Sequence, residues 1–279
     1  MPATRGVYFV ANDRVFDLAT VFLTSFRRHN PDIALRLIPF DAEHHRLAAL
    51  GERYGFTLWA DQELLSRCDE ISLAFHEHPK GHFRKLAAWA GEFNEFLYID
   101  SDTAVLRNID FVFDRLSGHG FLTATSHLPG RAWKDGIEES GKLTPEQYGY
   151  RANTGFVASR KGALTFAGIT AALPAARELA PHMKLGYEQP LLNYLMVTSG
   201  HRYTSLHRLR TTTGDRSIPA EVFAWTPDVE AKDGGIVHPA VPPTLLVHWT
   251  EPVKPTQQDP RTVPLYDLWC YYRDLHAVT

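Results

Sequence analysis

The pattern of apolar and polar positions predicts an α/β protein within the first forty residues. A continuous apolar run over 6–11 is followed by apolar residues at helical spacing over 16–28 and by a second apolar run over 34–40. Continuous apolar runs are typical of strands that are covered on both faces, as in a parallel sheet. We therefore expect the chain to open with a strand–helix–strand unit.

The same pattern continues as far as residue 102. It predicts a helix over 47–54, a strand over 56–59, an amphipathic helix over 83–93 and a buried strand over 95–99. Polar residues follow the first and the last of these strands, namely Asn12-Asp13 and Asp100-Ser101-Asp102. Because ligands of open parallel sheets bind beyond the carboxyl ends of the strands, we expect both groups to face one crevice.

The second half of the chain is less regular. The elements that we expect there are a polar, Gly-rich excursion over 127–150, a strand over 154–159, helices over 163–179 and 188–197, a stretch of mostly loop over 211–243, a buried strand over 245–247 and an aromatic helix over 265–275.

No linker rich in Gly, Ser or Pro divides the chain, and no block of like charges does so. We interpret the chain as one domain over 1–279. We expect three parts within it, over 1–115, 116–258 and 259–279, the last of which is a C-terminal helix.

Composition and charge exclude several classes of protein. Of the 279 residues, 44% are hydrophobic and 22% are charged, which is ordinary for a globular enzyme. The formal net charge of -3 argues against general electrostatic binding of nucleic acid or anionic lipid. The local exception is a basic cluster, which we interpret as a solvated loop, with a phosphate or acidic-acceptor site as the alternative; its members are Arg202, His207, Arg208 and Arg210.

Cysteine usage and hydropathy bear on the compartment. Only Cys68 and Cys270 are present, too few for a disulfide framework. No apolar run approaches the ~20 residues that span a bilayer. We therefore expect a cytoplasmic protein without stable membrane insertion.

The carboxylates Asp100 and Asp102 are the first candidates for chemistry. Two carboxylates one residue apart at a strand end can bind one hard cation such as Mg²⁺ or Mn²⁺, although such a pair also occurs in turns and helix caps. His248 follows another buried strand, and an imidazole would shift the preference from Mg²⁺ towards Mn²⁺. Lys254 stands shortly after His248, on a Pro-containing loop that would bring an ammonium group over a diphosphate.

Four short motifs occur in order along the chain. They are the apolar strand with Asp-x-Asp (96–102), Asn-x-Gly before a strand (153–155), an acidic residue with Gln at a helix start (188–189), and His-x5-Lys-Pro (248–255). This set resembles glycosyltransferase family 8, the retaining group that includes glycogenin and bacterial lipooligosaccharide galactosyltransferases. The resemblance implies the nucleotide-sugar-binding α/β fold called GT-A, with a mostly parallel central sheet flanked by helices. It implies that 1–115 is the nucleotide-binding half and that 116–258 carries the acceptor site and a metal-binding loop.

The resemblance also implies an activity and a site. It implies transfer of a hexose from a nucleotide diphosphate sugar, with a UDP-sugar as the expected donor, and Mn²⁺ or alternatively Mg²⁺ as the cofactor. The implied metal ligands are Asp100, Asp102 and His248. The residues implied to bind the donor are Ala11, Asn12, Asp13, Lys85, Asp100, Ser101, Asn153, Gly155 and Lys254. The residues implied to act in catalysis are Gln189, Glu188 and Lys254.

The family's chemistry implies retention of the anomeric configuration. Gln189 is a poor nucleophile, so we expect front-face attack, in which the departing phosphate takes the proton of the acceptor. Glu188 is the alternative nucleophile.

Some positions depart from the family's pattern. Val15 stands where an aromatic residue is common, Pro190 replaces a commonly acidic residue, and Glu251 occupies a position that is normally Gly. A catalytically impaired nucleotide-sugar-binding protein therefore stays open as an alternative. A haloacid-dehalogenase-like phosphohydrolase is a further one, since the segment 100–103 resembles its nucleophile motif, but that motif normally lies near the chain start.

The acceptor is not determined by these motifs. Variable loops build acceptor sites, and the expected loops here are 127–150 and 211–243. A saccharide, a small metabolite or a protein are the candidates, and nucleic acid is not expected.

Overall fold

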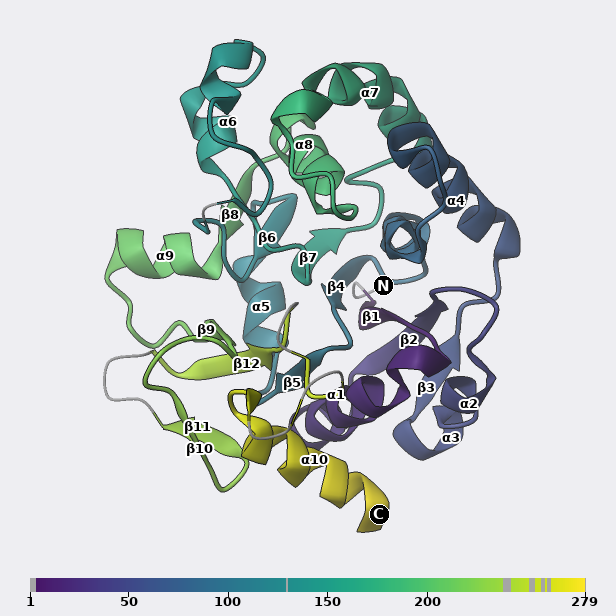
Figure 1. Cartoon of the computed structure of the whole chain (residues 1–279), viewed down its shortest axis with the longest axis vertical. Helices are drawn as coiled ribbons and strands as arrows, with labels where there is room; N and C mark the ends of the chain where they lie inside the picture. Colours follow the sequence, from purple (N-terminus) through teal and green to yellow (C-terminus); the bar gives the residue numbers. More distant parts are fainter. Residues whose placement is uncertain are drawn as a thin grey trace.

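A seven-stranded sheet forms the centre of the protein (Figure 1). The computed structural model describes residues 4–128, 130–237, 242–250, 254–256, 259 and 262–278. The strand order is β3-β2-β1-β4-β7-β6-β8. Only β7 runs antiparallel to its neighbours within this sheet, so the predicted mostly parallel sheet is confirmed. The strands are β1 (Arg5–Ala11), β2 (Ala34–Pro39), β3 (Phe56–Leu58), β4 (Glu95–Ile99), β6 (Phe121–Thr123), β7 (Phe156–Arg160) and β8 (Tyr203–Ser205).

Apolar side chains of each strand alternate between two cores. In β1, Phe9 packs on one face of the sheet, and Tyr8 and Val10 pack on the other. The first face is covered by α1 (Phe16–His29) and α5 (Asp110–Arg115). The second face is covered by α4 (Gln62–His76), η2 (Gly81–Ala90), α7 (Phe166–Leu179) and α8 (Gln189–Thr198), of which α4, α7 and α8 lie above the sheet in Figure 1. Both faces are covered, which explains the continuous apolar runs in the sequence.

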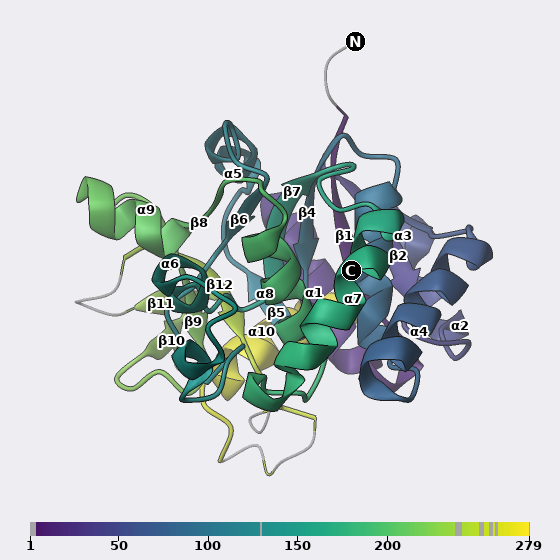
Figure 2. The same ribbon diagram turned by 90° about the horizontal axis from the view of Figure 1, so that it is seen from above.

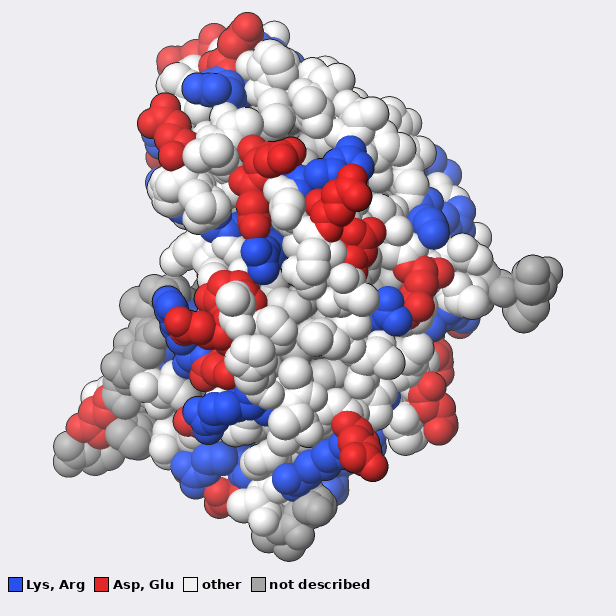
Figure 3. Space-filling model, turned by 90° about the vertical axis from the view of Figure 1, so that its right-hand side faces the viewer, with Lys and Arg blue, Asp and Glu red and all other residues white. Residues whose placement is uncertain are grey.

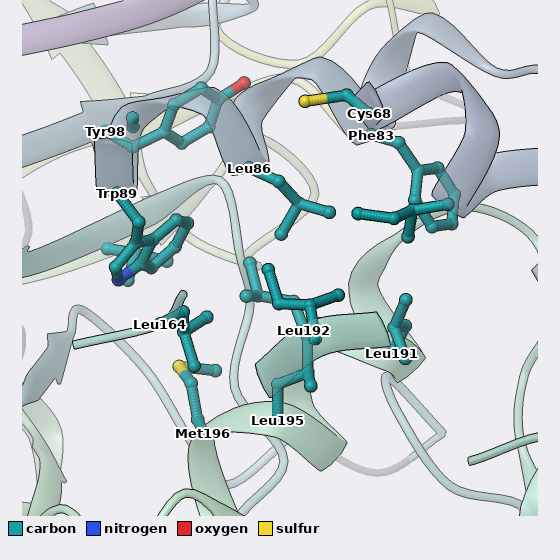
Figure 4. Close-up of a cluster of buried hydrophobic side chains, with 14 of the residues drawn as sticks. Cys68, Phe83, Leu86, Trp89, Tyr98, Leu164, Leu191, Leu192, Leu195 and Met196 are labelled. Carbon is teal, nitrogen blue, oxygen red and sulfur yellow. The ribbon is translucent and has the colours of Figure 1, made fainter. Parts of the chain in front are cut away.

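The core on the second face fixes two elements that carry candidate site residues, namely Lys85 on η2 and Gln189 on α8. Figure 4 shows Leu86 of η2 facing Leu192 of α8, and Trp89 of η2 above Leu164 and above Met196 of α8. The indole nitrogen of Trp89 also donates a hydrogen bond to the hydroxyl of Ser159, at 2.9 Å. This packing holds η2 and α8 against the sheet at fixed positions.

A second, three-stranded sheet brings the end of the chain back to the first half. Its order is β5 (Thr103–Val105), β12 (Thr244–His248) and β9 (Ala220–Phe223). In this register His248 pairs with Thr103 on one side and with Phe223 on the other. The sheet packs against α1 and the C-terminal helix α10 (Tyr266–Val278), which lies beside α1 in Figure 1. As a result, the end of β12 lies next to the carboxylate pair.

Several predicted elements differ from the structure. The single helix predicted over 47–54 is wrong, because α2 (His45–Ala48) and α3 (Gly51–Tyr54) are separate turns. The predicted helix over 83–93 is the 3₁₀ helix η2, since an apolar pattern over ten residues does not separate a repeat of 3.0 from one of 3.6. Helix α4 was not predicted, although its capping residue Asp61 precedes a regular apolar stripe.

The described part of 211–243 is mostly loop, as predicted, but it also contains several short elements. Helix α9 (Leu206–Thr213) extends into this region, and β9 is fully buried within it. A hairpin of β10 (Glu230–Lys232) and β11 (Gly235–Val237) follows. The excursion predicted over 127–150 contains η3 (Ile137–Ser140) and α6 (Pro145–Gly149), and the short turns η1 (Asp13–Val15) and η4 (Ala180–His182) complete the fold.

The surface shows no continuous basic field on the face drawn in Figure 3, where Lys and Arg side chains lie among Asp and Glu side chains. This agrees with the small net charge of -3. Within the described ranges, no helix is both long enough and apolar enough to cross a bilayer.

Candidate active site

A cleft of about 820 Å³ opens at the carboxyl ends of the parallel strands β1 and β4, which lie side by side in Figure 2. Asn12 after β1 meets Asp100, Ser101 and Asp102 after β4 there, as the sequence predicts. Most of the candidate residues line this cleft: Ala11, Asn12, Lys85, Asp100, Ser101, Asp102, Asn153, Glu188, Gln189, His248 and Lys254. Asp13 and Gly155 are the candidates that do not line it.

Three side chains from opposite ends of the chain converge in the cleft. The Nε2 atom of His248 lies 3.0 Å from Oδ1 of Asp102 and 3.9 Å from Oδ2 of Asp100. One ligand atom from each of the three residues lies within 4.8 Å of the other two. Two carboxylates and one imidazole form a donor set that suits Mn²⁺, and one that also accepts Mg²⁺. The proximity that the sequence motifs predict for these three residues is therefore confirmed.

A buried carboxylate orients the imidazole of His248. Oε1 of Glu221, on β9, lies 2.8 Å from Nδ1 of His248, and Asn153 donates a hydrogen bond to the same carboxylate oxygen at 2.6 Å. The hydroxyl of Thr125 donates to the other oxygen at 2.9 Å. An ionised carboxylate has no proton to donate, so Nδ1 carries the hydrogen and Nε2 is directed towards the aspartates. A carboxylate behind a histidine in this way is the usual support of a metal-ligating imidazole.

The charges of this group shift its ionisation. Burial lowers the pKa of His248, but Asp102 and Glu221 outweigh that effect and raise it to about 10. Burial raises the pKa of Asp102, and the positive charges of His248 and Lys254 outweigh it, so that this pKa is lowered. Because a metal ligand must be deprotonated, we expect metal binding at Nε2 to release a proton.

Glycine at position 155 makes room for this arrangement. A Cβ atom at Gly155 would lie 2.5 Å from Cε1 of His248 and 2.6 Å from Oδ2 of Asp100. Both distances are far below van der Waals contact, so any side chain here would displace two of the candidate ligands. Gly155 leaves the space that both ligands occupy, whereas the resemblance implies that it binds the donor.

A buried ion pair lies beside the carboxylate pair. The ammonium of Lys85, which is 3% exposed, lies 2.5 Å from Oε1 of Glu188 and 3.4 Å from Oδ1 of Asp100. Burial lowers the pKa of Lys85, but Asp100 and Glu188 outweigh it and raise this pKa above its ordinary value. The hydroxyl of Tyr98 donates a hydrogen bond of 2.6 Å to Oδ1 of Asp100. Tyr98 and Lys85 thereby hold the Asp100 carboxylate in one orientation.

Both ends of the Gln189 amide are held by the backbone. Its oxygen accepts a hydrogen bond from the amide of Thr154 at 3.1 Å, and its nitrogen donates to the carbonyl of Arg131. The hydroxyl of Thr154 donates to Oε1 of Glu188 at 2.9 Å, so the same residue also holds the neighbouring carboxylate. Lys254 lies nearby, with its ammonium 3.4 Å from Oδ2 of Asp102.

The candidates after β1 have local structural contacts. The side chain of Asn12 donates to Asp41 at 2.7 Å and accepts from the amide of Arg14 at 3.2 Å. The carboxylate of Asp13 accepts from the amides of Arg46 and Leu47, in the first turn of α2. Asn12 therefore faces the cleft, whereas Asp13 is directed to α2.

The hydroxyl of Ser101 donates to the carbonyl of Val10 at 3.2 Å, which ties the ends of β1 and β4 together. Val15 lines the cleft, so an aliphatic side chain stands where the family commonly has an aromatic one. Glu251 lies outside the described residues.

The sequence motifs did not identify three residues of this network. Glu221 lies in the region predicted as loop, although the alternation of Ala220, Glu221 and Val222 is typical of a strand. The sequence pattern predicts Tyr98 only as a core residue of a buried strand. Thr154 stands inside the Asn-x-Gly motif, at the variable position. None of the three has a local signal that separates it from ordinary core residues.

Known proteins were compared with the chain at the levels of sequence and structure. No family model and no curated protein matches the sequence. The fold matches the galactosyltransferase LgtC in complex with donor and acceptor sugar analogues, with a TM-score of 0.65, 15% identity, and coverage of 97% of this chain and 95% of LgtC.

Two further structures match over nearly all of this chain but only part of their own length. The glycosyltransferase GlyE of Streptococcus pneumoniae has a TM-score of 0.54 and 16% identity, with coverage of 96% of this chain and 60% of GlyE. The bifunctional glycosyltransferase WbbM has a TM-score of 0.62 and 12% identity, with coverage of 98% of this chain and 50% of WbbM. The chain therefore has the GT-A fold that these glycosyltransferases share.

Proposed function

We propose that the protein is a glycosyltransferase that moves a hexose from a nucleotide diphosphate sugar, with a UDP-sugar as donor, to an acceptor. The convergence of Asp100, Asp102 and His248 at 4.8 Å or less carries this proposal. A cation site beyond the carboxyl ends of β1 and β4 is where a diphosphate would bind in an open parallel sheet. The fold of LgtC, GlyE and WbbM supports the same activity.

The metal is proposed to be Mn²⁺, with Mg²⁺ as the alternative, held by the same three residues. When bound, it supplies a Lewis acid for the diphosphate. Glu221 orients the imidazole, Tyr98 and Lys85 orient Asp100, and Gly155 leaves the required space.

The departing phosphate acquires negative charge as the sugar is released. Lys254, whose ammonium already faces Asp102, is the residue proposed to stabilise this charge. Lys85 lies deeper, between Glu188 and Asp100, and its proposed role is to neutralise the buried carboxylates beside the diphosphate. Asn12 and Ser101, with the backbone of Ala11, are proposed to bind the base and ribose, and Asp13 to hold the turn that carries them.

The reaction is proposed to retain the anomeric configuration by front-face attack. The Gln189 amide is fixed at both ends, so it can present polar atoms to the sugar without acting as a nucleophile. The carboxylate of Glu188 is paired with Lys85 and accepts from Thr154, which lowers its nucleophilicity. NMR of the product measures the configuration, and an inverted product would remove this mechanism.

A thermal-shift screen of nucleotide sugars with and without Mn²⁺ tests the donor. Selective binding to the folded state raises the melting temperature, so we expect the largest shift with a UDP-sugar together with Mn²⁺. No shift with any UDP- or GDP-sugar would contradict the proposed donor. Slow release of UDP from the stabilising sugar, without added acceptor, would separate an active enzyme from a protein that only binds the donor.

A further inference from the structure

We propose that the acceptor carries an anionic group, a phosphate or a carboxylate, that binds Arg131, Lys134 and Lys184. These three residues are called the basic rim below, and all three line the cleft. The proposal rests on the proposed function and specifies the chemical class of the second substrate.

Backbone hydrogen bonds bring the basic rim together from two distant segments. Lys184 donates from its amide to the carbonyl of Ala132 at 3.1 Å, and Lys134 donates to the carbonyl of His182 at 2.8 Å. An antiparallel bridge joins Trp133 and Met183 between these bonds. The three cations therefore stand on two paired segments along one wall of the cleft.

The charges of the cleft are unevenly matched. The acidic side chains that line it are Asp100, Asp102 and Glu188, and all three belong to the metal end. There Lys85 pairs with Glu188 and Lys254 pairs with Asp102. Every acidic group of the lining is thus already engaged by a cation or by the proposed metal.

Among the described residues, those of the basic rim are not paired with carboxylates in this way. Within the described parts of the chain, no ion pair of 4.0 Å or less joins any of its residues to Asp or Glu. Arg131 donates to the hydroxyl of Thr250 at 3.4 Å, and Lys134 donates to the carbonyl of Pro181 at 2.9 Å. These hydrogen-bond partners carry no formal negative charge, and a bound anion would supply one.

The basic rim begins next to the proposed reaction centre. The amide nitrogen of Gln189 donates to the carbonyl of Arg131, so this arginine lies one contact from a residue proposed to face the sugar. The charge of the donor diphosphate is already matched by the proposed metal and by Lys254, which pairs with Asp102. An anion at the basic rim would therefore belong to the other substrate, which is the acceptor.

An exposed aromatic ring lies near Arg131 of the basic rim. Trp225 is 42% exposed and stacks on Phe223 at 4.8 Å with an interplanar angle of 5°. The guanidinium of Arg131 lies 5.3 Å from the Phe223 ring, and the indole of Trp225 donates to Thr250 at 3.2 Å. A flat apolar ring packs against the C–H face of a sugar, and adjacent cations bind an anionic substituent. The neighbouring groups thus suit a charged saccharide better than a neutral one.

Isothermal titration calorimetry with the donor site already filled tests the proposal. UDP and Mn²⁺ are added to saturation, and matched monosaccharides are then titrated: glucose, glucose 6-phosphate and glucuronic acid, with galactose, galactose 6-phosphate and galacturonic acid as a second series. We expect an anionic member of a series to bind at least about tenfold more tightly than its neutral parent. Raising the ionic strength from about 0.05 M to about 0.5 M should reduce this preference, because exposed charges are screened.

The charge-reversal variant Lys134→Glu/Lys184→Glu should lose the preference for the anionic sugar. Lys161→Glu is the matched control, since Lys161 is exposed and follows the end of β7 that lies away from Asp100. Equal binding of neutral and anionic sugars, or an unchanged preference in the double variant, would overturn the proposal. Failure of UDP to bind with Mn²⁺ in the first step would instead count against the proposed function. The order of affinity between phosphate and carboxylate identifies the group.

Discussion

At the metal end of the cleft the charged side chains hold one another, whereas at the basic rim they contact neutral oxygens and aromatic rings. His248, Asp102, Lys85 and Glu188 form direct ion pairs, and three of these four are less than 5% exposed. Lys134 and Lys184 are exposed and have no carboxylate partner within the described chain. The metal end is organised before any ligand binds, and the basic rim presents charge to whatever enters.

This difference predicts that equal changes of charge have unequal effects. Removal of a buried charge leaves its partner unpaired in a place that water does not reach. Removal of an exposed charge changes little in the folded protein, and its effect appears only when a ligand of opposite charge binds. The four predictions that follow compare the two regions.

Substitution of the buried lysine, Lys85→Met, should have the largest effect. Glu188 and Asp100 would lose their common cation, and breaking a buried pair from one side costs about 3 to 5 kcal/mol. Chemical denaturation measures the free energy of unfolding. The double variant Lys85→Met/Glu188→Gln should recover part of the loss, and no recovery would show that the pair is not the cause.

The isosteric change Asp102→Asn should strongly lower metal-dependent activity with a smaller effect on folding. It removes one ligand charge and the contact with Lys254, a loss of about 3 kcal/mol in transition-state stabilisation, or about a hundredfold in rate. Donor hydrolysis at saturating Mn²⁺ measures it. Asp114→Asn, at a side chain that is 69% exposed, is the control. Equal activity of Asp102→Asn and the control would contradict the proposed metal site.

The substitution Glu221→Gln, behind the imidazole of His248, should weaken the binding of the metal without abolishing it. The amide keeps the shape of the side chain but loses the charge that orients Nδ1 of His248, and such changes lower metal affinity about 10- to 100-fold. Titration with Mn²⁺ should give a raised Kd, and excess Mn²⁺ should restore the rate. A reduced rate at every Mn²⁺ concentration, with an unchanged Kd, would assign Glu221 another role.

Charge reversal at the basic rim should have the smallest effect on stability. Lys134→Glu and Lys184→Glu change exposed side chains, so each should alter the free energy of unfolding by about 0.5 kcal/mol or less. The melting temperature measures this, with Lys161→Glu as reference. A large loss of stability would mean that the basic rim is part of the folded framework, like Lys85.

The sheet was largely predictable from the sequence. Strands β1, β2 and β4 differ from the predicted ranges by at most one residue, because their covering on both faces leaves long apolar runs. The helices were predicted less evenly. The regular pattern of α1 gave its bounds within one residue, whereas α4 was missed and two turns around residue 50 were predicted as one helix.

The site was predictable where residue type and strand position coincide. Asp100 and Asp102 follow a buried strand directly, and ligand sites lie at such ends. Glu221 could not be predicted in the same way, because a Glu within a short apolar segment is normally on the exposed face of a strand. Its burial follows from its neighbours Asn153, Thr125 and His248, which lie far away in the sequence.

The sequence by itself determined the continuous apolar runs that build the sheet and the order of the polar motifs along it. Only the tertiary structure decided that Asp102 and His248, 146 positions apart, touch, and that Lys134 and Lys184 share one wall of the cleft. The physical reason is that the charge state, orientation and burial of a polar side chain depend on the groups around it. Those groups come together only when distant segments pack and pair.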